Sequence, residues 1–223
     1  MVELGCGDGT NLESFSQANL KGHGYDVSEK AIEIARSKKI NGFTVLKGDL
    51  FDLDISGKDL VLLLLTLEHL EDDISALRKI NSYLRKDGWF ILSVPAHPKK
   101  YSYQDRITGH YRRYDANQLK KLLTENGFCV REIASLGFPL CNIAVDCYNF
   151  ILKIHGTATT VQTGITPLTG IAGYWPHFPA GLRLLSHITF PVLSILRKLD
   201  TPFLNTDLGT HYLVFAKKYK NVF

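Results

Sequence analysis

Short apolar segments alternate with helical patterns along the first 138 residues. Strands are predicted at 2–4, at a short segment ending at 26–28, and at 43–46, 59–65 and 89–94. Between them, apolar residues recur at the three- and four-residue spacing that marks the buried face of a helix. The segment 59–65 is apolar at nearly every position, so it is expected to be a central strand. This alternation predicts a parallel sheet covered by helices on both faces.

Helix ends can be assigned from capping residues. Ser28 is placed to cap a helix that stops at 41–42, and Asp115 with Gln118 forms a capping-box pattern ahead of a helix that Gly127 ends. A helix after the first strand is expected to carry Leu12, Phe15 and Leu20. The apolar stripe of another helix is expected to consist of Ile74, Leu77, Ile80 and Leu84.

The distribution of charge divides the chain. Residues 139–204 contain only six charged side chains in 66 positions, together with six of the eight prolines. We expect two units: a core formed by 1–138 and 205–223, whose last strand lies near 211–216, and an apolar helical insertion at 139–204. The insertion is interpreted as a lid, a membrane-surface element or a dimer element.

The overall composition excludes several classes of protein. With 45% hydrophobic and 22% charged residues, the chain is globular, and a net charge of +4 without basic runs argues against a nucleic-acid partner. No secretory signal or spanning helix is predicted, so the expected compartment is cytoplasmic, with the inner face of the membrane as an option. The four cysteines lack metal-ligand spacing, so no metal site is expected.

A glycine-rich turn, followed by two acids, carries the candidate chemistry. Gly5, Gly7 and Gly9 lie between a strand and a helix, where missing Cβ atoms allow a ligand to approach the backbone. Asp26 ends the second strand, where a carboxylate can accept hydrogen bonds from a ribose diol. Asp49 follows the third strand and could accept from an adenine amine.

These motifs together resemble those of the class I S-adenosylmethionine-dependent methyltransferases. The resemblance rests on five features in order: the E-x-G-x-G-x-G loop from Glu3, the acid Asp26, the pair 48–49, the Leu-Glu-His-Leu segment 67–70, and the strand that ends at Pro95. It implies a Rossmann-like three-layer α/β sandwich with a mostly parallel seven-stranded sheet, whose last strand is antiparallel. The first strand is expected to be truncated, because only residues 2–4 precede the loop.

The resemblance also implies the cofactor, S-adenosylmethionine, and its contacts. Glu3 would lie near the methionine ammonium, Gly5 and Gly7 under the cofactor backbone, Asp26 on the ribose and Asp49 at the adenine. The remaining cofactor residues it implies are Gly9, Leu50, Leu65 and His69. The alternatives are that the glycines form only a tight turn, and that the two acids are a capping residue and a solvated loop residue.

The long segment after residue 95 is expected to bind the methyl acceptor. Long loops at the carboxyl edge of a parallel sheet usually serve binding, and the P-A-H, D and G-H-x-R-R-Y-D pattern resembles methyltransferases of sugar and cell-envelope pathways. The candidate catalytic residues are His110, His97 and Asp105, with His110 preferred as a base.

Three residues near His110 are candidates for substrate binding: Arg112, Arg113 and Tyr114. The alternative is a structural hydrogen-bond cluster that ties the loop to the helix beginning at Asp115.

The leading functional hypothesis is therefore methyl transfer to an oxygen of a small or lipid-linked acceptor. A hydroxyl acceptor needs a base, and His110 is the preferred candidate. A homodimer or a peripheral membrane contact through 139–204 is left open. One alternative is a degenerate cofactor-binding module without turnover. The other is a nicotinamide-dependent oxidoreductase, which the Thr10 side chain disfavours because it stands where the dinucleotide fingerprint has Gly or Ala.

Overall fold

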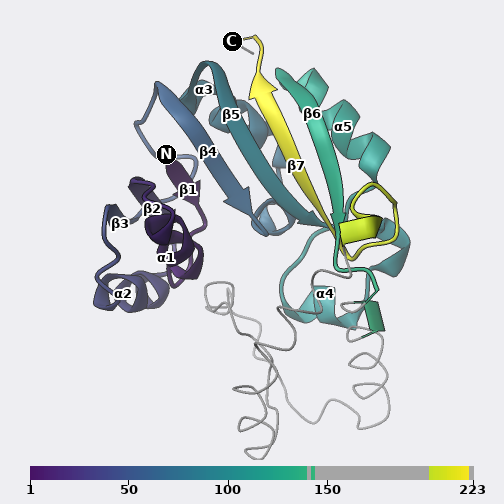
Figure 1. Ribbon diagram of the computed structural model, residues 1–223, viewed down its shortest axis with the longest axis horizontal. Coiled ribbons are helices and arrows are strands. Elements are labelled where there is room, and N and C mark those ends of the chain that lie inside the picture. The colour runs from purple at the N-terminus through teal and green to yellow at the C-terminus, as the bar shows by residue number, and fades with distance from the viewer. Residues whose placement is uncertain (140–141, 144–200, 221–223) are drawn as a thin grey trace, which may run out of the picture.

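The computed structural model describes residues 1–139, 142–143 and 201–220. These residues form one seven-stranded sheet with helices on both faces (Figure 1). The strands are β1 (Val2–Leu4), β2 (Gly22–Asp26), β3 (Phe43–Lys47), β4 (Lys58–Leu64), β5 (Leu84–Pro95), β6 (Phe128–Leu136) and β7 (His211–Lys218). The helices are α1 (Thr10–Gln17), α2 (Glu29–Ser37), α3 (Asp73–Tyr83), α4 (Tyr103–Ile107) and α5 (Ala116–Glu125), with 3-10 turns η1 (Leu67–His69) and η2 (Pro98–Lys100).

The strand order is β3-β2-β1-β4-β5-β7-β6. Strands β1 to β5 pair in parallel, whereas β7 runs antiparallel to both β5 and β6, as Figure 1 shows. This is the Rossmann-like sheet that the sequence predicts, and β1 has the expected three residues. From β1 the strands follow one another toward β3 at one edge, and from β4 they continue toward the other edge. The order of the strands therefore switches between β1 and β4, and a crevice is expected beyond the carboxyl ends of these two strands.

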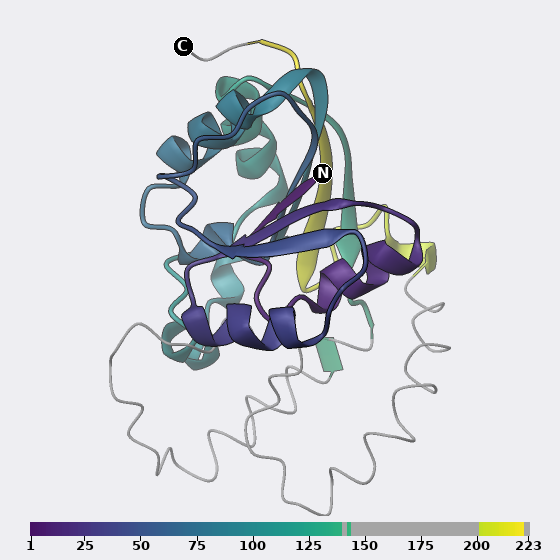
Figure 2. The ribbon, with the colours of Figure 1, turned by 90° about the vertical axis from the view of Figure 1, so that its left-hand side faces the viewer.

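Two apolar cores lie on opposite faces of the sheet. The larger core packs β1, β4, β5 and β7 against α3 and α5, and its buried residues include Ile80 and Leu123. The smaller core packs α1 and α2 on β3 through Leu12, Ile32 and Val45. Figure 2, viewed from the β3 side, shows α1 and α2 apart from α3 and α5 across the strands.

Several element boundaries differ from the predictions. Helix α2 ends at Ser37 rather than at 41–42, because Lys39 has a φ of 50°, outside the helical range. Ile74 is 43% exposed, and Leu84 belongs to β5 rather than to α3. The segment after β5 is not one open loop, since it contains η2 and α4.

Most of the predicted insertion at 139–204, with its expected lid, membrane or dimer role, lies outside the described residues. Its described end packs on the core: Ser135 N–H donates to the carbonyl of Leu204 at 2.7 Å, and the rings of Phe138 and Phe203 are 4.8 Å apart. The division into a core and an insertion stays a proposal. In the described ranges, no helix combines the length and apolar character needed to cross a membrane.

Candidate active site

A cavity of about 400 Å³ lies beyond the carboxyl ends of β1, β2 and β4. Six of the predicted cofactor residues line it: Gly5, Asp26, Asp49, Leu50, Leu65 and His69. Lining residues that the sequence reasoning did not select include Tyr25, Val27, Thr66, Thr108 and Tyr111. These residues lie at strand ends or in the segment after residue 95, and that position is the sequence signal by which they could have been selected. The fold thus brings segments from residue 4 to residue 111 to one edge of the sheet.

The glycine loop is tied to β2 by its own backbone. The N–H groups of Gly5 and Cys6 both donate to the carbonyl of Tyr25, at 2.7 and 2.9 Å. Gly5 and Gly7 have φ values of 72° and 55°, a conformation that favours glycine. The loop is therefore fixed before any ligand binds.

Gly9 packs against the α2 region. It is not among the residues that line the cavity. A Cβ at Gly9 would lie 2.7 Å from Ile40 Cδ1 and 3.1 Å from Ala35 Cβ, and the φ of Gly9 is 78°. The missing side chain lets the start of α1 pack on the α2 region, which sequence spacing alone does not show.

Asp26 both shapes the loop and faces the cavity. Its Oδ2 accepts from Gly7 N–H at 2.9 Å and its Oδ1 accepts from Ser28 N–H at 2.8 Å. Each carboxylate oxygen can accept a second hydrogen bond. Asp26 therefore caps the loop, which is the structural alternative, and its two oxygens can still accept hydrogen bonds from the hydroxyl groups of a ligand.

Glu3 is fully buried in β1, next to the lining residues Leu4 and Gly5. Its Oε1 accepts from Asn11 Nδ2 at 2.9 Å, whereas its Oε2 has no hydrogen-bond partner. Burial raises the pKa of Glu3 to about 7, and the nearby Asp26 charge adds to this effect. A buried, unpartnered carboxylate oxygen is costly, so it would favour a bound cation.

At the β3 end of the cavity, Asp49 is exposed and its Oδ1 accepts from Phe51 N–H at 2.8 Å. Leu50 beside it is buried. At the β4 end, Leu65 is 45% exposed with a φ of 51°. A non-glycine residue in this conformation stores strain, as residues at functional sites often do.

His110 is held by a buried carboxylate. Its Nδ1 lies 2.9 Å from Asp105 Oδ1, and the same oxygen accepts from Arg113 Nε at 2.8 Å. Burial opposes ionisation of Asp105, but the hydrogen bonds from His110 and Arg113 outweigh it and hold the pKa of Asp105 well below its usual range. Asp105 is therefore an ionised acceptor that positions His110.

The predicted substrate-binding residues have partners within the protein. Arg112 Nη1 pairs with Asp73 Oδ2 at 2.9 Å, and the hydroxyl of the buried Tyr114 donates to the same oxygen at 3.1 Å. Arg113 bonds to Asp105 and, through Nη1, to the carbonyl of Ala96 at 3.3 Å. These contacts favour the structural cluster that the sequence left as an alternative.

His97 is separate from this group. Its Nε2 donates to the carbonyl of Gly209 at 2.9 Å and its ring packs against Tyr212. Like His110 and Asp105, His97 is not among the residues that line the cavity, but His110 lies between the lining residues Gly109 and Tyr111. Of the three catalytic candidates, the structure brings only His110 and Asp105 together.

A residue that was not selected, Glu68, joins two histidines at the edge of the cavity. One carboxylate oxygen of Glu68 and one ring nitrogen each of His69 and His110 all lie within 4.8 Å of one another. The rings of His69 and His110 are 4.7 Å apart, nearly perpendicular. Burial raises the pKa of Glu68 to about 8 and lowers that of His69 to about 4. The Leu-Glu-His-Leu motif contained Glu68, but it did not indicate the contact with residue 110.

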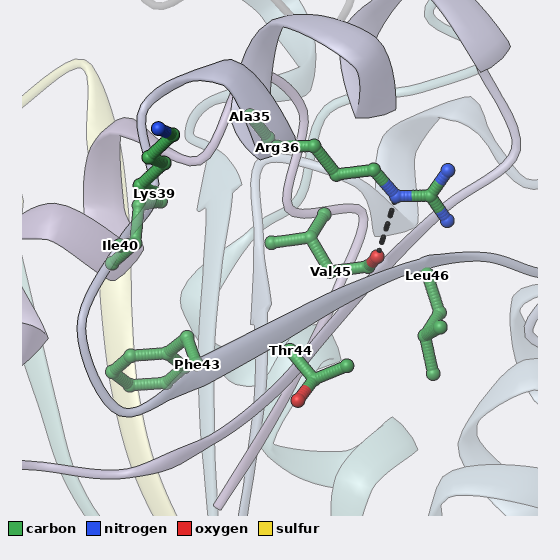
Figure 3. Close-up of a pocket in the computed structure, with 8 residues that line it drawn as sticks. All are labelled: Ala35, Arg36, Lys39, Ile40, Phe43, Thr44, Val45 and Leu46. Carbon is green, nitrogen blue, oxygen red and sulfur yellow. Dashed lines mark hydrogen bonds between the residues drawn. The ribbon is translucent and has the colours of Figure 1, made fainter.

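A second hollow, of about 380 Å³, lies between α2 and the edge strand β3 (Figure 3). Arg36 lies across it with Nε donating to the carbonyl of Val45 at 3.0 Å. Most of its other lining side chains are apolar, and it contains no acid or histidine. It therefore offers no candidate chemistry.

Comparison with known proteins gives a family for this fold. A family model described as "Methyltransferase domain" matches residues 1–133. The chain is 23% identical over 157 residues to the ubiquinone biosynthesis O-methyltransferase of Nitrosospira multiformis, covering 62% of the chain and 66% of that protein. It is 28% identical over 108 residues to the protein of the same name from Bordetella avium, covering 45% of each. The chain thus spans less than two thirds of the length of these relatives.

Solved structures share the fold. Phosphoethanolamine N-methyltransferase 2 of Haemonchus contortus, in complex with S-adenosyl-L-methionine, aligns with a TM-score of 0.61 and 17% identity, covering 99% of this chain and 48% of that one. At this identity the similarity establishes the architecture alone.

Proposed function

The chain belongs to the class I S-adenosylmethionine-dependent methyltransferases, and from that premise we propose that it transfers a methyl group from S-adenosylmethionine to an oxygen of a small or lipid-linked acceptor. The observation that carries the proposal is the cavity beyond β1, β2 and β4, in which the fixed glycine loop and Asp26 meet. The names of the curated relatives support oxygen as the methylated atom.

The residues around the cavity fit the cofactor. Glu3 offers a buried carboxylate oxygen without a partner, which suits the cofactor's ammonium group. Asp26 retains acceptor capacity for the ribose hydroxyls. Asp49 and Leu50 follow β3, where the adenine ring would lie. Gly7 supports the site indirectly, since its N–H orients Asp26.

Bound S-adenosylmethionine supplies a methyl group activated by a sulfonium: as the acceptor oxygen bonds to the methyl carbon, the carbon–sulfur bond breaks and its electron pair stays on sulfur. The protein's task is to align the acceptor and to make its oxygen nucleophilic. We assign the second task to His110. The ionised Asp105 accepts from Nδ1, which leaves the lone pair of His110 on Nε2.

Calorimetry with S-adenosylhomocysteine tests the cofactor site. Replacing Asp26 by Asn removes the charge but keeps one carbonyl acceptor, and it is expected to weaken binding by about 1.5–3 kcal/mol because charge-assisted hydrogen bonds are lost. Asp54→Asn, which does not line the cavity, is the matched control. Tight binding of NADH with no binding of S-adenosylhomocysteine would instead support the oxidoreductase alternative.

A single-turnover assay with a labelled methyl donor tests turnover. Transfer of label to a hydroxylated acceptor is expected, with a loss on the order of 10²-fold or more in His110→Gln at unchanged cofactor affinity. Cofactor binding without any transfer, across a panel of hydroxylated small and lipid-linked acceptors, would support a binding module without turnover.

A further inference from the structure

We propose that Glu68, His69 and His110 bind a divalent transition-metal ion of the zinc class at the edge of the cavity. The three side chains come from two parts of the chain: Glu68 and His69 lie on η1, after β4, while His110 follows α4. Backbone hydrogen bonds fix the two segments together, since Tyr111 N–H donates to the carbonyl of Glu68 at 2.8 Å. The three potential ligand atoms all lie within 4.8 Å of one another.

The hydrogen bonds of the two histidines engage the same ring nitrogen, Nδ1, and leave Nε2 available in both. The Nδ1 of His69 lies 3.3 Å from the carbonyl oxygen of Gly109, which can only accept a hydrogen bond. The Nδ1 of His110 lies 2.9 Å from the carboxylate of Asp105. Both rings therefore carry their proton on Nδ1 and leave a lone pair on Nε2. Metal-binding histidines almost always show this arrangement, with the far N–H on a carbonyl or carboxylate.

The buried carboxylate of Glu68 also favours a bound cation. It is 1% exposed, and its Oε2 has no hydrogen-bond partner in the described structure. Arg113 is the cation whose charge influences Glu68, but its Nε and Nη1 are committed to Asp105 and to the carbonyl of Ala96. A buried acceptor left without a partner costs free energy, and a bound cation removes that cost.

The donor set selects the class of ion. Two imidazole nitrogens and one carboxylate oxygen suit Zn²⁺, Co²⁺ or Fe²⁺, whereas Mg²⁺ and Ca²⁺ prefer oxygen ligands throughout. Three protein ligands leave a coordination position open, as catalytic zinc sites do. Because His69 also lines the cavity, the open position can face it.

The catalytic role of this ion rests on the proposed function, although its binding does not. An acceptor hydroxyl bound at the open position would release its proton to solvent more readily, because the cation stabilises the oxyanion. The oxygen's electron pair then forms the bond to the methyl carbon while the carbon–sulfur pair remains on sulfur. In this arrangement His110 would make the acceptor oxygen nucleophilic indirectly, as a ligand of the metal ion that binds the hydroxyl.

The test uses tag-free full-length protein, stripped with a chelator and titrated with Co²⁺ and Zn²⁺. We expect one equivalent of Co²⁺ to bind with visible d–d absorption, and Zn²⁺ to displace it. Glu68→Gln keeps the side-chain shape and should weaken Co²⁺ affinity on the order of 100-fold, since it replaces an anionic carboxylate ligand by a neutral amide oxygen, a weaker ligand. Asp105→Asn should weaken it by about 10–100-fold, because it acts through His110.

Two variants serve as matched controls: Glu71→Gln, an exposed glutamate three residues from Glu68, and His23→Asn, a histidine on β2. Both should bind Co²⁺ as the unsubstituted protein does. Failure of the unsubstituted protein to bind one equivalent, or equal weakening in the controls and in Glu68→Gln, would overturn the proposal.

Folding and the cofactor site are checked separately. Thermal denaturation and calorimetry with S-adenosylhomocysteine are run on the metal-free protein and on each variant. Metal-free protein that binds S-adenosylhomocysteine but takes up no Co²⁺ would reject the metal site and leave the proposed function standing. Binding of Co²⁺ without binding of S-adenosylhomocysteine would reject the proposed cofactor site and leave the metal site standing.

Discussion

Replacing Glu3 by Gln tests whether the buried carboxylate in β1 receives the cofactor's ammonium group. Gln has nearly the same size as Glu and can still accept the hydrogen bond from Asn11. The substitution removes the ionisable group alone. Because burial raises the pKa of Glu3 to about 7, the wild-type carboxyl is partly protonated near neutral pH before any ligand binds.

The first consequence is on stability. In the unfolded chain Glu3 ionises near 4.5, whereas in the folded protein it ionises near 7, so the unfolded state binds fewer protons between these values. The contribution of Glu3 to stability is therefore full below about pH 4.5, falls as the pH rises to about 7 and then stays level. At about 1.4 kcal/mol per pKa unit the total fall is about 3 kcal/mol. Glu3→Gln should lack this slope.

The second consequence is on binding. With a pKa of about 7, Glu3 is roughly one tenth ionised at pH 6 and nine tenths ionised at pH 8. If the ionised form receives the ammonium group, affinity for S-adenosylhomocysteine should rise about tenfold between these pH values. Binding at pH 6 should also release close to one proton, which appears as a dependence of the binding enthalpy on the buffer.

Urea denaturation between pH 4 and 8 and calorimetry in two buffers measure both effects. Glu33→Gln, an exposed glutamate on α2, is the control and should retain the wild-type pH dependence. The reasoning is refuted if Glu3→Gln keeps the wild-type stability slope and the wild-type rise in affinity, because another group would then be responsible.

Two further substitutions test structural assignments. Gly9→Ala should lower the free energy of unfolding in urea by about 1–3 kcal/mol, because residue 9 has a φ of 78° and its new Cβ would crowd Ile40. The affinity for S-adenosylhomocysteine should stay unchanged, and a loss of affinity at unchanged stability would instead place Gly9 in the cofactor site. Arg113→Ala should cost about 3–5 kcal/mol in thermal denaturation, since it leaves the buried Asp105 with less compensation. A stable Arg113→Ala protein with weakened, salt-dependent acceptor binding would instead favour substrate binding.

Local patterns in the sequence predict most of the elements. The segment 59–65 coincides with the central strand β4 except at Leu65, which follows the strand, and Ser28 caps α2 by accepting from Ala31 N–H at 3.3 Å. These features depend on neighbours in the chain, so periodicity and capping chemistry are sufficient to predict them. The order of five motifs also indicates the family, and Asp26 reaches the cavity as expected.

The end of α2 and the exposure of Ile74 could not be predicted, because they depend on packing between elements. The same is true of Gly9, whose pattern suggests a ligand although its close neighbours are Ile40 and Ala35. Hydrophobic periodicity reports that a face is buried, but it does not report what covers it.

The sequence by itself therefore determined the fold, the family and the cavity-lining positions at the ends of β2 and β3, since these follow from motifs placed at the ends of successive strands. Tertiary structure alone decided how the segment after β5 meets the end of β4. His110 meets Glu68 and His69 across some forty residues because the segment after β5 folds back over the end of β4, with Tyr111 bonded to Glu68. Such a contact depends on the path of a loop, which no local pattern in the chain encodes.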